Sequence, residues 1–218
     1  MTTAFVTGGN RGLGYEIIKS LLIERPECRV VLGSRSLQAG QAAALTLGNT
    51  YGAGRVVAMQ IDVTSRPSID AAVAAVCRQT QHLDILINNS GVLLDSDDPS
   101  VLFDLEAART TLRVNLDGAI SVTEAFLPLL SRTATASILF TSSGQGTRAL
   151  GQLSEAHRLA LDAPGLDTPR LKKIFAQMVE DLADASNPYH AIPSPSYSLS
   201  KLGLNCYTQV DAPRNSTP

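Results

Sequence analysis

The chain of 218 residues has no tryptophan, three cysteines and only 17% charged residues. Its formal net charge is −2 and no basic run stands out, which argues against a nucleic-acid surface. The apolar runs have the length of strands rather than of membrane-spanning helices, and no basic leader precedes the first of them. We therefore expect a cytoplasmic protein with no membrane or nucleic-acid partner.

Cysteine and histidine are too few and too scattered for a disulfide framework or a metal site. Cys28, Cys77 and Cys206 are odd in number and far apart, which is typical of reduced thiols. The three histidines lack the spacing of metal ligands, so we predict no metal. Hydrophobic residues make up 44% of the chain, which is enough for one globular domain with a sizeable core.

Short apolar runs alternate with helical patterns as far as about residue 141. Strands are expected at about residues 3–7, 29–33, 55–61, 84–87 and 137–141, with helices between them, the longest at about 101–130. This alternation predicts an α/β fold, a doubly wound, Rossmann-like parallel sheet with helices on both faces. Residues 144–196 show helical patterns only, and one of these helices is expected to open with a cap at Thr168.

The first expected strand runs into a glycine-rich segment, Thr7-Gly8-Gly9-Asn10-Arg11-Gly12-Leu13-Gly14. Glycines at this place allow a tight turn and the close approach of a phosphate, and the N-terminus of the next helix attracts the anion. The spacing differs from the commoner Gly-x-Gly-x-x-Gly, and turns before helices also hold glycines for purely structural reasons. The expected cofactor contacts in this segment are Gly8, Asn10, Arg11, Gly12, Leu13 and Gly14.

The end of the second expected strand lacks the acidic residue that usually holds the ribose hydroxyl of NAD. Arg35 stands there instead, and a guanidinium pairs with a 2′-phosphate through two hydrogen bonds. Arg11 is placed to reach the same group. Both arginines would otherwise be solvated surface residues. The sequence therefore favours NADP(H) over NAD(H) as the cofactor.

Two further strand ends carry polar residues at the edge of the sheet where a cofactor would lie. Asp62 and Val63 follow the third strand, where Asp62 either accepts a hydrogen bond from an adenine amino group or caps the next turn. Asn88-Asn89-Ser90-Gly91 follows the fourth strand, with amides suited to fixing loop backbone and a glycine suited to close approach. We count Asp62, Val63, Asn89 and Gly91 among the expected cofactor contacts.

Tyr197 and Lys201 form a Tyr-x-x-x-Lys pair, which shares one face of a helix. A free phenol has a pKa of about 10 and is a poor acid at neutral pH, but a nearby ammonium favours the phenolate. Ser143 follows the fifth strand and is suited to donate to a substrate oxygen. Asn115 is a poor helix former inside the long helix, where it either bends the helix and holds a water or is a satisfied polar core residue.

Taken together, these motifs resemble the short-chain dehydrogenase/reductase family from the start of the chain to about Val210. The likeness is strongest to the cytosolic, NADPH-dependent carbonyl reductases, through the glycine segment, Arg148-Ala149-Leu150 and the helical stretch before Tyr197. Ser90 stands where the family usually has alanine. The resemblance implies hydride transfer from NADPH to a small-molecule ketone, aldehyde or quinone.

The same resemblance assigns roles to the expected catalytic residues. Tyr197 would be the acid, and Lys201 would bind the nicotinamide ribose, so both also belong to the cofactor site. Ser143 would bind the carbonyl oxygen, and Asn115 would belong to a proton relay. In many relatives the outer face of the tyrosine helix pairs with another subunit. The helical stretch is expected to cover that face here and to make the protein a monomer.

The resemblance also implies a domain organisation. We expect one NADP-binding, Rossmann-like domain over residues 1–210, with a helical insertion at 144–196 and a polar tail at 211–218. The tail contains two prolines and cannot continue the tyrosine helix, so we expect a C-terminally truncated chain that lacks the family's last strands. Two interpretations stay open: an active NADPH-dependent carbonyl reductase, or a truncated, non-catalytic member that at most binds nucleotide or a partner chain.

Overall fold

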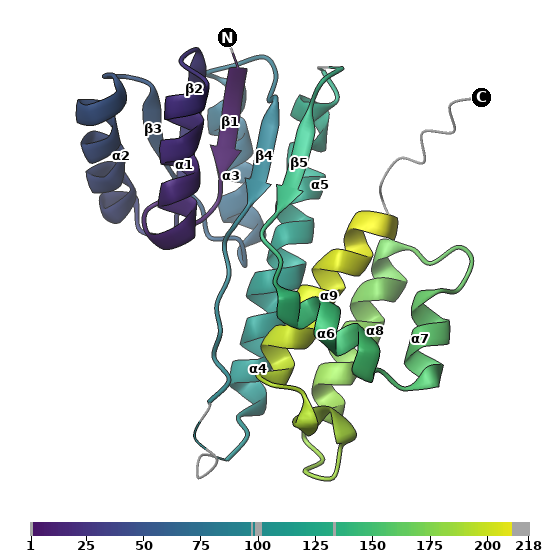
Figure 1. Ribbon diagram of the computed structural model, residues 1–218. Helices are drawn as coiled ribbons and strands as arrows, with labels where there is room; N and C mark the ends of the chain where they lie inside the picture. Colours follow the sequence, from purple (N-terminus) through teal and green to yellow (C-terminus); the bar gives the residue numbers. More distant parts are fainter. Residues whose placement is uncertain (1, 97, 99–101, 133, 211–218) are drawn as a thin grey trace. The chain divides into compact units, whose positions relative to one another are not determined.

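The computed structural model of the protein describes residues 2–96, 98, 102–132 and 134–210 (Figure 1). The chain divides into two compact units, which we call unit 1 (Met1–Ser90 with Gly118–Thr141) and unit 2 (Gly91–Asp117 with Ser142–Pro218). The expected tail at 211–218 lies outside the described residues. Within the described ranges, no helix combines the length and the apolar character needed to cross a bilayer.

Unit 1 is built on a parallel sheet of five strands. These are β1 (Thr2–Val6), β2 (Cys28–Ser34), β3 (Val56–Gln60), β4 (Ile85–Asn88) and β5 (Ser137–Phe140), in the order β3-β2-β1-β4-β5. Its helices are α1 (Gly12–Glu24), α2 (Leu37–Tyr51), α3 (Arg66–Cys77) and α5 (Gly118–Leu130). Helices α1 and α2 cover one face of the sheet and α3 and α5 the other (Figure 1). The expected doubly wound α/β fold is confirmed.

Side chains of β1 alternate between the two faces of the sheet, as the pleat of a strand requires. Ala4 and Val6 belong to a core cluster with Ile18 of α1 and residues of α2. The ring of Phe5 points the other way and lies 4.7 Å from the ring of Phe126 on α5. Because helices cover both faces, both sets of side chains are apolar, and this gives the near-continuous apolar runs of the sequence.

The regular elements in the described part of unit 2 are all helical, and loops connect them. Its elements are α4 (Leu105–Leu112), the π-helical turn η1 (Arg113–Asp117), α6 (Gly144–Gln152), α7 (Glu155–Leu161), α8 (Thr168–Asp181), the 3-10 turn η2 (Pro188–Ala191) and α9 (Pro195–Val210). Helix α9 contacts α4, α6 and α8. Helix α8 buries Leu171, Phe175 and Met178 completely and packs on α9 and α4. The described residues 144–196 thus form helices and no strand, as their pattern predicts, while their role as an insertion stays a prediction.

Two helix starts differ from the expectation. The long helix begins at Leu105, because the Asp104 carboxylate accepts hydrogen bonds from the amides of Glu106 and Ala107 at 2.9 and 3.0 Å. The expected start at about residue 101 lies outside the described residues. Helix α8 is capped by Asp167, whose carboxylate accepts from the amide of Arg170 at 2.9 Å, so the expected cap at Thr168 is wrong by one residue.

Candidate active site

The loop between β1 and α1 depends on its glycines. Gly8 and Gly12 have φ values of 65° and 57°, in the left-handed region that favours glycine. A Cβ on Gly14 would lie 2.4 Å from the carbonyl oxygen of Gly8 and 2.5 Å from Nδ2 of Asn89, so a side chain does not fit there. A Cβ on Gly12 would meet no atom of the described chain within 4 Å. The loop is thus tightly packed at Gly14 and open at Gly12.

Helix α1 begins without a side-chain cap. Arg11 is its N-cap residue, and within the described residues its side chain makes no capping hydrogen bond. Helices α2, α3, α4 and α8 each begin on a serine or aspartate side chain that accepts a hydrogen bond from a backbone amide. The amide groups in the first turn of α1 are therefore available to an anion.

Thr7 and Asn89 tie the glycine loop to the end of β4. The Thr7 hydroxyl accepts hydrogen bonds from the amides of Asn89 and Ser90, at 2.9 and 3.0 Å. The Asn89 side-chain amide donates to the carbonyls of Thr7 and Gly8, at 3.0 and 3.3 Å. Asn89 therefore fixes loop backbone, as its motif predicts. Thr7 was missing from the expected site residues, although a buried threonine that opens a glycine loop is a recognisable signal.

Arg11 and Arg35 are both exposed at the surface of unit 1. In the described part of the chain, neither guanidinium takes part in a hydrogen bond or an ion pair. The main-chain carbonyl of Arg35 accepts from the side chain of Gln60 at 3.3 Å, which fixes the backbone beneath the exposed side chain. Both arginines are free to meet an anionic ligand.

The other expected cofactor residues of unit 1 differ in exposure. Asn10 is half-buried, and Leu13 is 59% exposed in the first turn of α1. Asp62 is half-buried, and its Oδ1 atom accepts from the amide and the hydroxyl of Thr64, at 2.9 and 2.7 Å. The turn-capping alternative for Asp62 is therefore realised. Val63 is buried, and a Cβ on Gly118 of α5 would lie 2.8 Å from it, which makes Val63 a packing residue.

Tyr197 and Lys201 lie one turn apart on α9, as expected. Lys201 is only 3% exposed, and its Nζ atom lies 5.5 Å from the centroid of the Tyr197 ring. Burial lowers the pKa of the Lys201 ammonium to about 8, because water no longer solvates the charge. At neutral pH a positive charge therefore faces the tyrosine ring, while Tyr197 itself is half-buried.

Asn115 is fully buried in the π-helical turn η1. Its side-chain amide donates to the carbonyl of Val92 at 2.8 Å and to the Ser200 hydroxyl at 3.0 Å, and Oδ1 accepts from the amide of Val92 at 2.8 Å. The helix departs from α geometry at Asn115, which agrees in part with the expected bend. The side-chain amide is also a satisfied polar group that holds a loop, which agrees with the other alternative, a satisfied polar core residue.

Ser143 is the N-cap of α6, where its hydroxyl oxygen accepts from the amide of Gln145 at 3.2 Å. The preceding Ser142 hydroxyl lies 3.2 Å from the carbonyl of Lys201 and 2.7 Å from Oδ1 of Asn205. The start of α6 is therefore tied to the middle of α9. Ser143 therefore stands at the start of a helix that packs on α9, the helix of Tyr197 and Lys201.

Gly146 was not among the expected site residues, although it determines how closely α6 approaches α9. A Cβ at this position would lie 2.7 Å from the amide nitrogen of Leu202 and 2.7 Å from the carbonyl carbon of Lys201. Helix α6 thus approaches the backbone of α9 at a distance that only glycine allows. A glycine inside a helix is costly, so its place three residues after Ser143 was a usable signal.

The expected residues divide between the units. All four expected catalytic residues belong to unit 2: Asn115, Ser143, Tyr197 and Lys201. Gly91 also belongs to this unit, since a Cβ there would lie 3.3 Å from Oδ1 of Asn115 and 3.5 Å from Nζ of Lys201. Unit 1 holds the other expected cofactor contacts: Gly8, Asn10, Arg11, Gly12, Leu13, Gly14, Arg35, Asp62, Val63 and Asn89.

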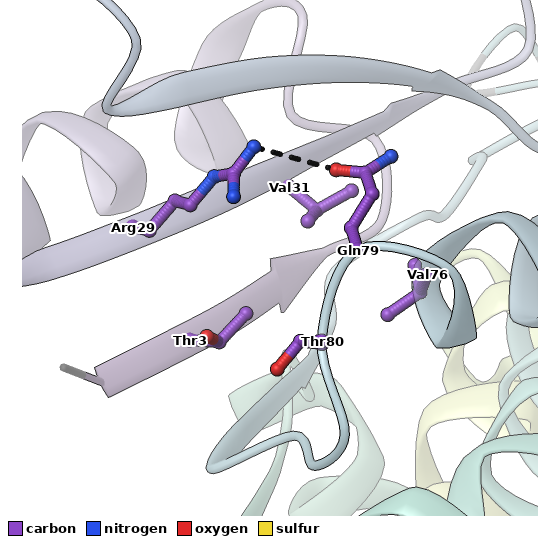
Figure 2. Close-up of a pocket in the computed structure, with 6 residues that line it drawn as sticks. All are labelled: Thr3, Arg29, Val31, Val76, Gln79 and Thr80. Atoms are coloured by element: carbon purple, nitrogen blue, oxygen red, sulfur yellow. Dashed lines mark hydrogen bonds between the residues drawn. The ribbon is translucent and has the colours of Figure 1, made fainter.

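A small pocket lies elsewhere in unit 1, near the amino ends of β1 and β2. Figure 2 shows its lining, Thr3, Arg29, Val31, Val76, Gln79 and Thr80, with Arg29 donating to the side-chain oxygen of Gln79 at 3.5 Å. Its volume of about 40 Å³ suits a water molecule rather than a nucleotide. It also lies at the opposite end of the strands from the glycine loop, and so is not part of the candidate site.

Comparison with known proteins places these observations in a family. The model of the short chain dehydrogenase family matches residues 2–155. The short-chain dehydrogenase/reductase ATR10 of Stachybotrys chlorohalonatus is 36% identical over 169 residues, which cover 76% of this chain and 59% of that protein. Carbonyl reductase [NADPH] 3 of Rattus norvegicus is 29% identical over 212 residues, 95% of this chain and 72% of that protein.

The fold agrees with the sequence comparison. The solved structure of menthone neomenthol reductase from Mentha piperita superposes with a TM-score of 0.84 at 27% identity, over 97% of this chain and 84% of that one. By contrast, the chain spans less than two thirds of the length of ATR10 of Stachybotrys chlorohalonatus. The matched model covers most of the described residues, and the sheet order and the glycine loop lie within it. The chain belongs to the short-chain dehydrogenase/reductase family of oxidoreductases.

Proposed function

We propose that the protein is an NADPH-dependent carbonyl reductase that reduces a ketone, aldehyde or quinone carbonyl, with Tyr197 as the general acid. The observation that carries this proposal is the pair on α9, where a buried lysine holds its Nζ atom 5.5 Å from the centroid of the tyrosine ring. Reduction of a carbonyl produces an alkoxide that needs a proton. A phenol beside a fixed positive charge is suited to supply it.

Lys201 stabilises the phenolate that remains after Tyr197 has donated its proton. With a pKa of about 8, the Lys201 ammonium is charged at neutral pH. Its burial increases the effect, since a charge acts more strongly where water is excluded. We propose that the same ammonium also binds the nicotinamide ribose.

Ser143 supplies a second donor for the carbonyl oxygen. Its oxygen accepts from the amide of Gln145, and among the described residues its hydroxyl hydrogen has no acceptor, so this hydrogen suits a substrate oxygen. Two donors on one oxygen polarise the carbonyl and hold it in place as negative charge develops. Asn115 has both amide hydrogens engaged, so we propose that it joins a proton relay only as an acceptor.

The residues of unit 1 fit a dinucleotide phosphate. The uncapped first turn of α1 offers amide donors, and the loop is open at Gly12, where a phosphate would approach the backbone. Exposed Arg35 and Arg11 suit a 2′-phosphate, and for this reason we propose NADP(H) rather than NAD(H). When bound, the cofactor supplies the hydride. A contact from Asp62 to the adenine amino group stays a prediction, as do contacts from Asn10, Leu13, Val63, Asn89 and Gly91.

The comparisons support carbonyl compounds as the substrate class, and the individual substrate of this chain stays open. The Rattus norvegicus relative is named a carbonyl reductase that uses NADPH, and the Mentha piperita structure is a reductase of menthone. We propose that residues 1–210 act as one nucleotide-binding domain with a helical insertion at 144–196. We further propose that the protein is cytoplasmic. We also propose that it is a monomer, because α8 already covers faces of α9 and α4.

NADPH-dependent turnover by the purified 218-residue chain tests this proposal. Oxidation of NADPH is followed with a ketone, an aldehyde and a quinone, and binding of NADPH is measured separately. Tyr197→Phe is expected to lower kcat by about two to four orders of magnitude and to leave NADPH binding unchanged. Tyr51→Phe, a half-buried tyrosine of α2, is the matched control and keeps full activity.

Three results would count against the proposal. Turnover that survives in Tyr197→Phe would mean that another group is the acid. NADPH binding without turnover of any of the three carbonyls would favour a non-catalytic nucleotide-binding protein. A chain that neither binds NADPH nor turns over a carbonyl would leave only binding to a partner chain.

A further inference from the structure

Helix α9, which carries Tyr197 and Lys201, begins in an unusual way. Ser194 directly before it has a φ of 45°, a left-handed conformation that is rare outside glycine. Pro195 opens the helix and has no amide hydrogen. The first backbone donors of α9 are therefore the amides of Ser196 and Tyr197, and they need an acceptor from outside the helix.

Asp95 provides this acceptor from a segment about one hundred residues earlier in the chain. Its Oδ1 atom accepts from the amide of Ser196 at 3.1 Å, and its Oδ2 atom accepts from the Ser196 hydroxyl at 2.8 Å and from the amide of Tyr197 at 2.9 Å. A carboxylate at the N-terminus of a helix is held by charge-assisted hydrogen bonds and by the helix dipole.

The same segment reaches Tyr197 by a second route. The backbone of Val92, three residues before Asp95, is held by two hydrogen bonds to the side chain of Asn115. Asn115 also donates to the Ser200 hydroxyl, which in turn donates to the main-chain carbonyl of Tyr197 at 2.7 Å. Both main-chain polar groups of Tyr197 are therefore fixed, the amide by Asp95 and the carbonyl through Ser200.

We propose that Asp95 is a positioning residue for the reaction, which sets the direction of the Tyr197 phenol by holding the first turn of α9. The proposal rests on the function proposed above, in which Tyr197 is the acid. Displacement of a catalytic group by about 1 Å can lower the rate of a reaction by about a hundredfold. A segment that fixes the backbone of the acid on both sides therefore acts on the rate without touching the substrate.

The test compares Asp95→Ala with Asp167→Ala and Asp95→Asn. Asp167 caps α8, a helix without any of the proposed catalytic residues, so its alanine variant controls for the loss of a helix cap. Asp95→Asn keeps an acceptor oxygen and tests rescue. We expect Asp95→Ala to lower kcat at least about tenfold with KM for NADPH nearly unchanged, Asp167→Ala to stay within about twofold, and Asp95→Asn to recover most of the loss.

Two further measurements separate positioning from general destabilisation. Hydrogen exchange at the amides of Ser196 and Tyr197 is expected to become at least about tenfold faster in Asp95→Ala and to stay unchanged in Asp167→Ala. In the Tyr197→Phe background, Asp95→Ala is expected to lower the residual turnover no further, because a residue that acts through Tyr197 has nothing left to position.

Each failure has its own signature. Unchanged exchange at both amides, or kcat within about twofold of the parent in Asp95→Ala, overturns the proposal. Equal losses of kcat in Asp95→Ala and Asp167→Ala overturn it as well, because they assign the effect to lost helix stability. A parent chain that reduces no carbonyl contradicts the proposed function and with it the positioning of the acid by Asp95. In that case, faster exchange still shows that Asp95 holds Tyr197.

Discussion

The Nζ atom of Lys201 lies 5.5 Å from the centroid of the Tyr197 ring, and Lys201 is the more deeply buried of the two residues. Burial holds the pKa of Lys201 at about 8, below its ordinary value of 10.5. The lysine is therefore charged where the proposed acid needs a cation, and it loses this charge at mildly alkaline pH. Two predictions depend on this relationship.

The first concerns the pH dependence of turnover. We expect kcat/KM for carbonyl reduction to fall by about tenfold per pH unit above the pKa of Lys201, because the neutral amine no longer stabilises the phenolate. Initial rates between about pH 6 and 10 measure this, with NADPH kept saturating. A profile that stays level to about pH 9.5 would show that the charge of Lys201 is not required.

The second concerns stability. The folded protein binds the Lys201 proton less tightly than the unfolded chain does, so the buried charge lowers the free energy of unfolding. This destabilisation is fully present below about pH 8 and disappears as pH rises towards 10.5. Lys201→Met removes this destabilisation and is expected to raise the free energy of unfolding at pH 7 by on the order of 3 kcal/mol while abolishing turnover. Denaturant titration measures it, with exposed Lys173→Met as control. A destabilised Lys201→Met variant contradicts the prediction.

Arg35 carries the prediction on cofactor choice. Loss of a charge-assisted phosphate contact typically costs about 1.5–3 kcal/mol, so Arg35→Ala is expected to weaken NADPH binding at least about tenfold. NADH lacks the 2′-phosphate, and its binding is expected to change little. Titration calorimetry with both cofactors measures the difference, and exposed Arg78→Ala of the same unit controls for general attraction of anions. Equal losses for NADPH and NADH would remove the basis of the NADP(H) assignment.

Gly146 carries a prediction on the geometry of the site. In Gly146→Ala, the added Cβ would lie 2.7 Å from the backbone of α9, so α6 must move away and take Ser143 with it. We expect a loss of stability and a fall of kcat by at least about tenfold. Gly151→Ala in the same helix meets no described atom within 4 Å and is expected to stabilise by up to about 1 kcal/mol. Thermal melts measure the stability of both variants and initial rates measure kcat. Equal effects of Gly146→Ala and Gly151→Ala would contradict the prediction.

The packing of α8 leads to the prediction on assembly. Leu171, Phe175 and Met178 are already buried, and α8 contacts both α9 and α4. Arg109 of α4 also forms an ion pair with Glu180 of α8, at 2.5 Å. We expect sedimentation velocity to show a monomer at all protein concentrations. A dimer fraction that grows with concentration would mean that the protein assembles through surfaces other than the faces of α9 and α4 that α8 covers.

The sheet was predictable because covered parallel strands are apolar on both faces, so β1 to β5 stand out as short runs between helical patterns. The chemistry-bearing pairs were predictable where their spacing is local, as for Tyr197 and Lys201. Asp95 was not predictable, because nothing in its own sequence neighbourhood indicates a partner about one hundred residues away. For Asn115, the sequence indicates only a poor helix former inside a helix. The π-helical turn itself was not predictable, because it depends on hydrogen bonds to Val92 and Ser200.

The open first turn of α1 has a consequence for how this protein behaves without its cofactor. A missing helix cap typically leaves a protein about 1 kcal/mol less stable. Any anion that settles on those amides restores that stability, so ordinary phosphate or sulfate in a buffer is expected to raise the melting temperature and to compete with nucleotide. The uncapped N-terminus of α1 thus makes the stability of the cofactor-free protein depend on the anions in solution. The apparent affinity for the cofactor will therefore depend on the buffer in which it is measured.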